Sequence, residues 1–128
     1  MNDVRSGPAA VTEVSGGAEA DAAADLARRF AAVARLHGES AYRHFVDAHV
    51  VVVGVGGVGS WAAEALARSA VGRITLIDLD HIALGNTNRQ VHALGDAYGQ
   101  VKVQAMAARI SAINPACTVQ TIEEFVSG

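Results

Sequence analysis

The feature that most constrains this chain is a glycine-rich segment directly after a run of valines. Val50–Val53 is typical of a buried strand and leads into Gly54-Val55-Gly56-Gly57-Val58-Gly59-Ser60. Asp78 follows at the end of a second strand-like segment. Glycines let a backbone approach a phosphate where a β-carbon would collide, and the amides of a following helix favour an anion. We therefore predict a nucleotide site, the alternative being a glycine-rich turn without a ligand. Its expected binding residues are Gly54, Gly56, Gly57, Gly59 and Asp78.

The order of the elements predicts an α/β fold. Strands are expected at about 49–53, 73–78 and 118–122, and helices between them at about 58–70 and 100–113. This alternation, with right-handed crossovers, predicts a Rossmann-like parallel sheet with helices on both faces. We expect Gly72 to end the first of these helices. A fourth strand is due where the sequence stops at Gly128, so we interpret the chain as the first three-stranded half of a doubly wound sheet.

Two regions precede the expected sheet. Residues 1–24 mix alanine, glycine, serine and acids without helical or strand periodicity, so we predict a disordered tail there. From Asp25 to Gly38 apolar residues recur at helical spacing, and a second short helix is expected at 39–47. The predicted division is therefore a tail at 1–24 and an incomplete nucleotide-binding domain at 25–128.

Composition narrows the possible partners and compartment. A length of 128 residues suits one domain, and a net charge of -3 argues against a broad basic surface for nucleic acid. One cysteine, Cys117, excludes an internal disulfide and fits a reducing compartment. No stretch approaches the roughly 20 apolar residues of a membrane span, and no leader resembles a signal peptide. We expect a cytoplasmic protein without a membrane span.

Other reactive residue types form no recognisable pattern. None of the five histidines has metal-ligand spacing to another or to Cys117, so no metal site is predicted from this sequence. No serine, histidine and acid arrangement can be assembled, and Ser60 is interpreted as a helix N-terminal hydroxyl. Asp80 could serve a nucleotide, help a magnesium ion or cap its loop, and we favour a structural role.

Polar residues in the loop after Asp78 supply candidates for holding charged oxygens. Asn86, Asn88, Arg89 and Gln90 offer amide and guanidinium donors within five residues. Arginine is suited to forked contacts with phosphate oxygens. The alternative is a turn whose asparagines bond their own backbone while Arg89 is merely solvated.

Lys102 is the single lysine of the chain. On a helix that starts near Gln100 it aligns with Met106 and Ile110, on the stripe expected to face the sheet. A cation at a helix N-terminus is unfavourable by a few tenths to about 1 kcal/mol, and a bound triphosphate would reverse that sign. We predict that Arg89 and Lys102 contact phosphate oxygens. The alternative for Lys102 is a surface lysine on the first turn.

Several motifs stand in one order along the chain. They are the glycine segment at 54–60, Ile77-Asp78-Leu79-Asp80, Asn86-Thr87-Asn88-Arg89-Gln90, Lys102 and Ile113-Asn114-Pro115. With them, the chain resembles the adenylating enzymes of the ubiquitin-activating (E1-like, ThiF- and MoeB-type) superfamily, which activate a carboxylate with ATP. Stretches at 34–39, 59–68 and 86–94 are similar to its tRNA threonylcarbamoyladenosine dehydratase branch. The resemblance spans about Arg29 to Phe125.

The resemblance implies specific roles. Gly57 and its neighbours would receive the ATP phosphates, Asp78 would hold the ribose hydroxyls, and Asn86, Arg89 and Lys102 would clamp the phosphates. Arg89 and Lys102 would also be the catalytic residues, through neutralisation of phosphate charge. The branch implies adenylation of the threonylcarbamoyl carboxylate at adenosine 37 of a tRNA, then cyclisation with loss of AMP. It further implies Mg²⁺, a homodimer and possible sulfur-relay partners. The magnesium-binding aspartate of such enzymes would lie beyond the sequence given, so the activity of this chain alone is an open point.

An arginine near the N-terminus reaches a neighbouring subunit's ATP in related enzymes. The motif that carries this arginine is not cleanly reproduced here, so Arg29 and Arg35 are candidates for that role only.

Two other functions fit part of the pattern. An NAD-dependent dehydrogenase domain could use the same glycines and Asp78, although a dinucleotide's pyrophosphate does not need both Arg89 and Lys102. A non-catalytic dimerising or sulfur-relay partner domain would keep the fold without activity. Nucleotide affinities and AMP formation separate these possibilities from an adenylating enzyme.

Overall fold

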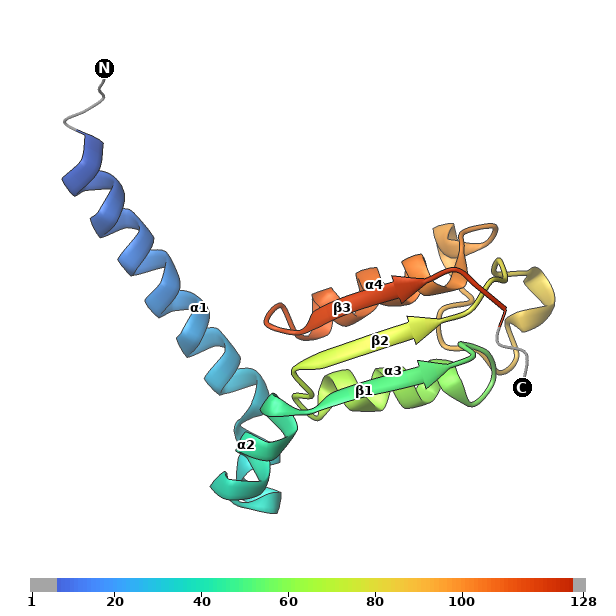
Figure 1. Cartoon of the computed structure of the whole chain (residues 1–128), viewed down its shortest axis with the longest axis horizontal. Coiled ribbons are helices and arrows are strands. Elements are labelled where there is room, and N and C mark those ends of the chain that lie inside the picture. Colours follow the sequence, from blue (N-terminus) through green and yellow to red (C-terminus); the bar gives the residue numbers. More distant parts are fainter. Residues whose placement is uncertain (1–6, 126–128) are drawn as a thin grey trace. The chain divides into compact units, whose positions relative to one another are not determined.

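The computed structural model describes residues 7–125, with side chains described from residue 16 onward. Contacts divide the chain into two compact units, residues 1–32 and 33–128, and each is considered by itself. The elements appear in Figure 1. In chain order they are α1 (Gly7–His37), α2 (Glu39–Asp47), β1 (His49–Val53), α3 (Gly59–Arg68), β2 (Arg73–Ile77), the short 3-10 helices η1 (Leu84–Asn86) and η2 (Gly95–Ala97), α4 (Lys102–Ile113) and β3 (Thr118–Ile122).

The predicted α/β architecture is confirmed. The three strands form a parallel sheet in the order β1-β2-β3, with Val52 opposite Leu76 and Leu76 opposite Thr121 (Figure 1). Parallel pairing of consecutive strands requires a crossover, and α3 and α4 supply the two crossovers. All three carboxyl ends therefore meet at one edge of the sheet, where the glycine segment begins.

We predicted helices on both faces of the sheet, but within the described residues α3 and α4 share one face. Helix α3 packs on β1, α4 packs on β2 and β3, and the two helices contact each other. Both fall on the same face because the strand order moves in one direction; helices cover both faces only where that order reverses. The covered face is buried, as at Ile74 and Leu76, whereas Val51 and Val53 on the opposite face are 50% and 56% exposed.

Helix α1 begins much earlier than the sequence predicted. We expected a helix from Asp25 and a tail without regular structure at 1–24, but α1 already begins at Gly7. The reason is that alanine, frequent here, has the highest intrinsic helix propensity, so a helix can form without an apolar stripe. The described side chains of residues 16–24 are correspondingly exposed. Residues 1–6 lie outside the described residues, and the mobility predicted for 1–24 stays a prediction.

Gly72 has a different role from the one predicted. The left-handed residue after α3 is Ala70, with φ 70°, and not Gly72. A β-carbon on Gly72 would lie 1.8 Å from the carbonyl oxygen of Val46, so the glycine lets β2 begin directly beside the end of α2. The Gly72 amide also donates to the Phe45 carbonyl, at 3.2 Å. Among the described residues, no helix has the length and apolar character needed to cross a membrane.

Candidate functional site

The glycine segment forms a tight turn between β1 and α3. Gly54 has φ 86°, a left-handed conformation that favours glycine, and its amide donates to the Ile77 carbonyl at 2.8 Å. A β-carbon on Gly59 would lie 1.7 Å from the carbonyl oxygen of Gly54, which only a displaced backbone could accommodate. These two glycines therefore set the shape of the turn, and α3 begins directly at Gly59.

Two further glycines leave their amides available. Gly56 and Gly57 stand ahead of the first residue of α3, and their backbone amides make no hydrogen bond within the described part of the chain. A β-carbon at either position would meet only the side chains of Gln90 or Arg89, at 3.7 Å. Amides at a helix N-terminus attract anions, since the helix dipole and the N–H groups act together. The turn therefore fits a phosphate group.

Asp78 lies where the ribose-binding acid was predicted, at the end of β2. Its Oδ2 accepts the Val55 amide at 2.7 Å, and its Oδ1 accepts the Asp80 amide at 2.8 Å. A cavity of about 190 Å³ opens beside it. The cavity is lined by Val53, Gly54, Ile77, Asp78, Leu79, Asp80, Glu124 and Phe125. Asp78 thus joins the glycine turn to a cavity at the carboxyl edge of the sheet.

Arg89 lies against the glycine turn, beside Gly57. Its Nη1 donates to the Gly85 carbonyl at 3.1 Å and to Asn88 Oδ1 at 2.9 Å, and the residue is exposed. Asn86 Oδ1 accepts the Ala83 amide at 2.8 Å, which closes the turn of η1. The loop therefore contains the local turn considered as an alternative, and it also brings Arg89 to the turn. That Asn86 and Arg89 bind phosphate stays a prediction.

Lys102 is buried, only 6% exposed, so the alternative of a surface lysine is wrong. Its amide donates to the Asp80 carbonyl at 2.9 Å, and its Nζ lies 4.0 Å from Asp80 Oδ2. Met106 and Ile110, on the same stripe of α4, are fully buried, as the spacing predicted. Lys102 thus lies on the Asp80 side of the edge and Arg89 on the Gly57 side. That Lys102 contacts phosphate remains a prediction.

His92 was not identified from the sequence, yet it is part of this region. The imidazole is 2% exposed, and its Nε2 lies 2.8 Å from the Val55 carbonyl oxygen. Burial lowers the pKa of His92, although the Val55 hydrogen bond opposes this, and nearby Lys102 lowers it further. No sequence signal separates such a histidine from a surface one, because the spacing between His92 and the turn is set by the tertiary fold.

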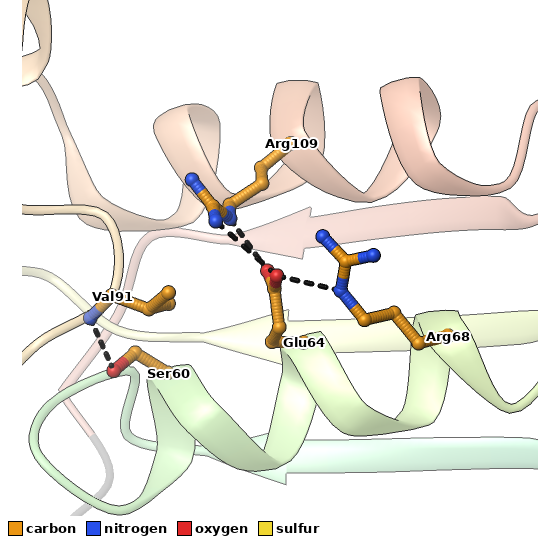
Figure 2. A network of polar contacts seen from close by, with 5 residues as sticks. All are labelled: Ser60, Glu64, Arg68, Val91 and Arg109. Atoms are coloured by element: carbon orange, nitrogen blue, oxygen red, sulfur yellow. Dashed lines mark hydrogen bonds and ion pairs between the residues drawn. The ribbon is translucent and has the colours of Figure 1, made fainter.

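Glu64 was also missed, and it forms the network in Figure 2. This buried carboxylate on α3 accepts hydrogen bonds from Arg109 of α4 and from Arg68, the latter at 2.8 Å. Burial raises the pKa of Glu64, but the bonds to Arg109 and Arg68 outweigh it and hold the pKa below its usual value. The hydrogen bond between Arg109 and Glu64 also raises the pKa of Arg109. The network joins the two helices that carry the turn and Lys102.

A magnesium site held by this chain does not fit the described residues. They contain no group of three histidine, cysteine, aspartate or glutamate side chains able to hold a metal ion. Asp78 and Asp80 lie close together, but Asp78 already bonds two backbone amides and Asp80 lies beside Lys102. The described residues therefore offer a metal ion no complete ligand set.

Sequence comparison identifies the family. The ThiF family profile matches residues 27–128. The chain belongs to the ThiF family. It is 57% identical over 100 residues to the tRNA threonylcarbamoyladenosine dehydratase of Escherichia coli, covering 78% of this chain and 37% of that protein. The corresponding Bacillus subtilis dehydratase is 52% identical over 88 residues, covering 69% and 35%. The chain thus spans little more than a third of the length of these two relatives.

Solved structures agree with this assignment. A crystal structure of the Escherichia coli dehydratase in complex with ATP has a TM-score of 0.78 and 56% identity, covering 79% of this chain and 42% of that one. A second structure of the same enzyme, in complex with AMP, has the same TM-score and identity. The partial Rossmann-like ThiF fold is therefore confirmed.

Proposed function

We propose that this chain provides the nucleotide-binding part of an ATP-dependent tRNA threonylcarbamoyladenosine dehydratase. The chief support is its 57% identity with the Escherichia coli dehydratase, of which a structure with ATP is known. The glycine turn, with two available amides beside an acid and an arginine, is independent support from the residues themselves. Available amides at the start of a helix favour a bound anion.

The proposed roles follow from where the residues lie. Gly54 and Gly59 shape the turn, and Gly56 and Gly57 offer amides to phosphate oxygens. Asp78 accepts the ribose hydroxyls on its remaining lone pairs while it keeps its two backbone amides. Arg89 exchanges its bonds to Gly85 and Asn88 for phosphate oxygens, and Asn86 holds the loop in place. Lys102, beside Asp80, contributes a buried positive charge.

The chemistry asks mainly for positioning and charge neutralisation. ATP supplies the adenylyl group: a carboxylate oxygen of the threonylcarbamoyl group bonds to the α-phosphorus and pyrophosphate leaves. Ring closure then displaces AMP. Negative charge that develops on phosphate oxygens is stabilised by fixed donors, here the turn amides, Arg89 and Lys102. Preorganised donors of this kind are effective because they do not have to reorient during the reaction.

The partners belong to the proposal as well. The substrate would be a tRNA carrying threonylcarbamoyladenosine, and the net charge of -3 means that tRNA docking would need a local basic patch or residues outside this sequence. The proposal also includes a homodimer and sulfur-relay proteins as protein partners. It further includes Mg²⁺ bound with ATP and a cytoplasmic location.

The decisive experiment measures nucleotide binding and pyrophosphate exchange by this chain. We expect ATP to bind and NAD not to bind, by calorimetry with and without magnesium. Exchange of labelled pyrophosphate into ATP, in the presence of modified tRNA, is measured beside a version extended through the next strand. Preferential NAD binding would overturn the proposal in favour of a dehydrogenase domain. ATP binding without AMP formation in either version would favour a non-catalytic partner domain.

A further inference from the structure

We propose that His92 is a positioning residue of the nucleotide site: its imidazole fixes the Val55 carbonyl and so directs the next amide, that of Gly56, toward the phosphate. The inference rests on the proposed function, because it deepens the account of the same site.

The geometry at Val55 carries the inference. Val55 is fully buried in the middle of the turn. Its amide donates to Asp78 Oδ2 at 2.7 Å, and its carbonyl oxygen lies 2.8 Å from His92 Nε2. Two side chains from different segments therefore hold both polar groups of one turn residue. Because the Val55 carbonyl belongs to the peptide whose nitrogen is that of Gly56, fixing this oxygen also fixes the direction of the Gly56 N–H.

Proton positions at His92 follow from this contact. A carbonyl oxygen can only accept, so Nε2 must carry the hydrogen. In the neutral imidazole Nδ1 is then an acceptor, and it is buried without a hydrogen-bond partner among the described residues. An imidazole that bonds a carbonyl through Nε2 alone acts as a donor of fixed direction, which is what positioning requires.

The segment around His92 is itself anchored to the start of α3. Trp61 Nε1 donates to the Arg89 carbonyl at 2.8 Å, and the Val91 amide donates to Ser60 Oγ at 3.2 Å. Figure 2 shows the Ser60 contact next to the Glu64 network. His92 thus closes a ring of contacts that joins the Arg89 loop, the glycine turn and α3. The glycine turn and the loop that carries Arg89 are held in one arrangement.

Three variants separate positioning from a general structural role. In His92→Gln, the side-chain amide nitrogen can reach about the place of Nε2 and still donate to Val55. In His92→Asn, the shorter side chain ends near the place of Nδ1. The hydrogen bond to the Val55 carbonyl is then lost, although a polar side chain remains. His92→Leu removes hydrogen bonding and keeps an apolar side chain of moderate size. The Gln and Asn variants are the matched pair.

The first measurement is ATP affinity by calorimetry on the 128-residue chain, at a temperature where thermal melts show every variant folded. We expect His92→Gln to stay within about twofold of the unsubstituted chain, and His92→Asn and His92→Leu to bind about tenfold more weakly. Equal affinities in all four proteins, or equal losses in the Gln and Asn variants, would overturn the positioning role. A purely structural role would change the melting temperature alone.

The second measurement is amide hydrogen exchange at residues 55–57 without nucleotide. We expect slow exchange at the Val55 amide in the unsubstituted chain and in His92→Gln, and faster exchange in His92→Asn and His92→Leu. Identical exchange in all four would show that His92 does not hold the turn. This arm is independent of ATP: if the unsubstituted chain fails to bind ATP, the proposed function fails while the exchange data still test His92.

Discussion

The glycine turn and the loop at 84–90 both face the same sheet edge, but they are held in different ways. The turn is supported by buried groups from other segments, namely Asp78 and His92 on Val55. In the loop, the Asn86 and Arg89 side chains bond locally: Asn86 bonds Ala83, and Arg89 bonds Gly85 and Asn88. Substitution of the close-packed Gly59 should therefore disturb the fold, whereas removal of the exposed Arg89 side chain should disturb mainly binding. A preformed cradle beside an adaptable cation suits a site that must receive and release a charged ligand.

The largest effect is expected for Gly59→Ala. Its β-carbon would lie 1.7 Å from the Gly54 carbonyl oxygen, so the backbone of the turn has to move. We expect a loss of about 4 kcal/mol in the free energy of unfolding, or failure to fold, as judged by urea denaturation. The control is Gly57→Ala, whose β-carbon would meet only Arg89 at 3.7 Å and should cost about 0.5 kcal/mol or less. Similar losses in both variants would contradict the account of the turn.

Glu64→Gln tests the support beneath the turn. It leaves Arg109 without its charged partner between α3 and α4. Because Arg109 is partly exposed, water can solvate its unpaired charge, and this lowers the cost in stability. We expect about 2 kcal/mol lower stability in urea denaturation. Arg68→Ala is the matched control, because that side chain is 60% exposed and its loss should cost about 0.5 kcal/mol or less. A larger effect at Arg68 than at Glu64 would show that the bond between the helices is unimportant.

Arg89→Ala should show the opposite behaviour, because Arg89 is exposed and its partners are local. We expect ATP affinity to fall about tenfold, or about 1.4 kcal/mol, while the melting temperature stays nearly unchanged. Arg89→Lys keeps the positive charge but lacks the paired donors of the guanidinium group, so it should recover only part of the ATP affinity. If Arg89→Ala lowers stability as much as affinity, the division between rigid turn and adaptable loop fails.

The smallest expected effect is a pH dependence from His92. Its folded pKa is lowered, so the unfolded chain takes up this proton more readily than the folded chain. Stability should therefore be unaffected well above 6.5 and should fall as the pH drops below it. Thermal melts at about pH 7.5 and about pH 5.5 should show this decrease in the unsubstituted chain and less of it in His92→Gln. An equal decrease in both proteins would assign it to other groups.

Glu64 adds a separate pH dependence of stability, at lower pH than that of His92. Because its folded pKa is lowered, its contribution is present above 4.5 and is lost as the pH falls through the folded value. In Glu64→Gln this acid-induced loss should be smaller, as acid titration followed by circular dichroism would show. The two groups can be separated because their ordinary pKa values differ.

Local sequence patterns predicted the sheet well. The bounds of β1 and β3 match the prediction, and β2 ends at Ile77, one residue before the predicted end. Runs of β-branched residues carry that signal in all three strands, and Gly54 and Gly72 mark one end of β1 and β2. The start of α1 was missed because the prediction relied on apolar periodicity, which an exposed alanine-rich helix does not need. The role of Gly72 was missed because its close contact is with Val46, on a different element.

The candidate site was predictable only where a residue acts through its own local motif. The glycines and Asp78 stand out because their spacing follows the path from strand to helix to strand. His92 and Glu64 act through partners that the fold brings near from distant positions, Val55 and Arg109, so one sequence gives no sign of them. Lys102 was ambiguous for the same reason: only the fold decides whether the start of a helix is buried.

The strand order β1-β2-β3 has a practical consequence. Within the described residues, β1 and β3 are edge strands, and β1 also presents half-exposed valines on the open face of the sheet. Unpaired strand edges next to apolar surface are templates for adding another chain. Concentrated samples of this polypeptide should be handled as aggregation-prone, and charged substitutions at Val51 or Val53 are the first remedy to try when it is purified.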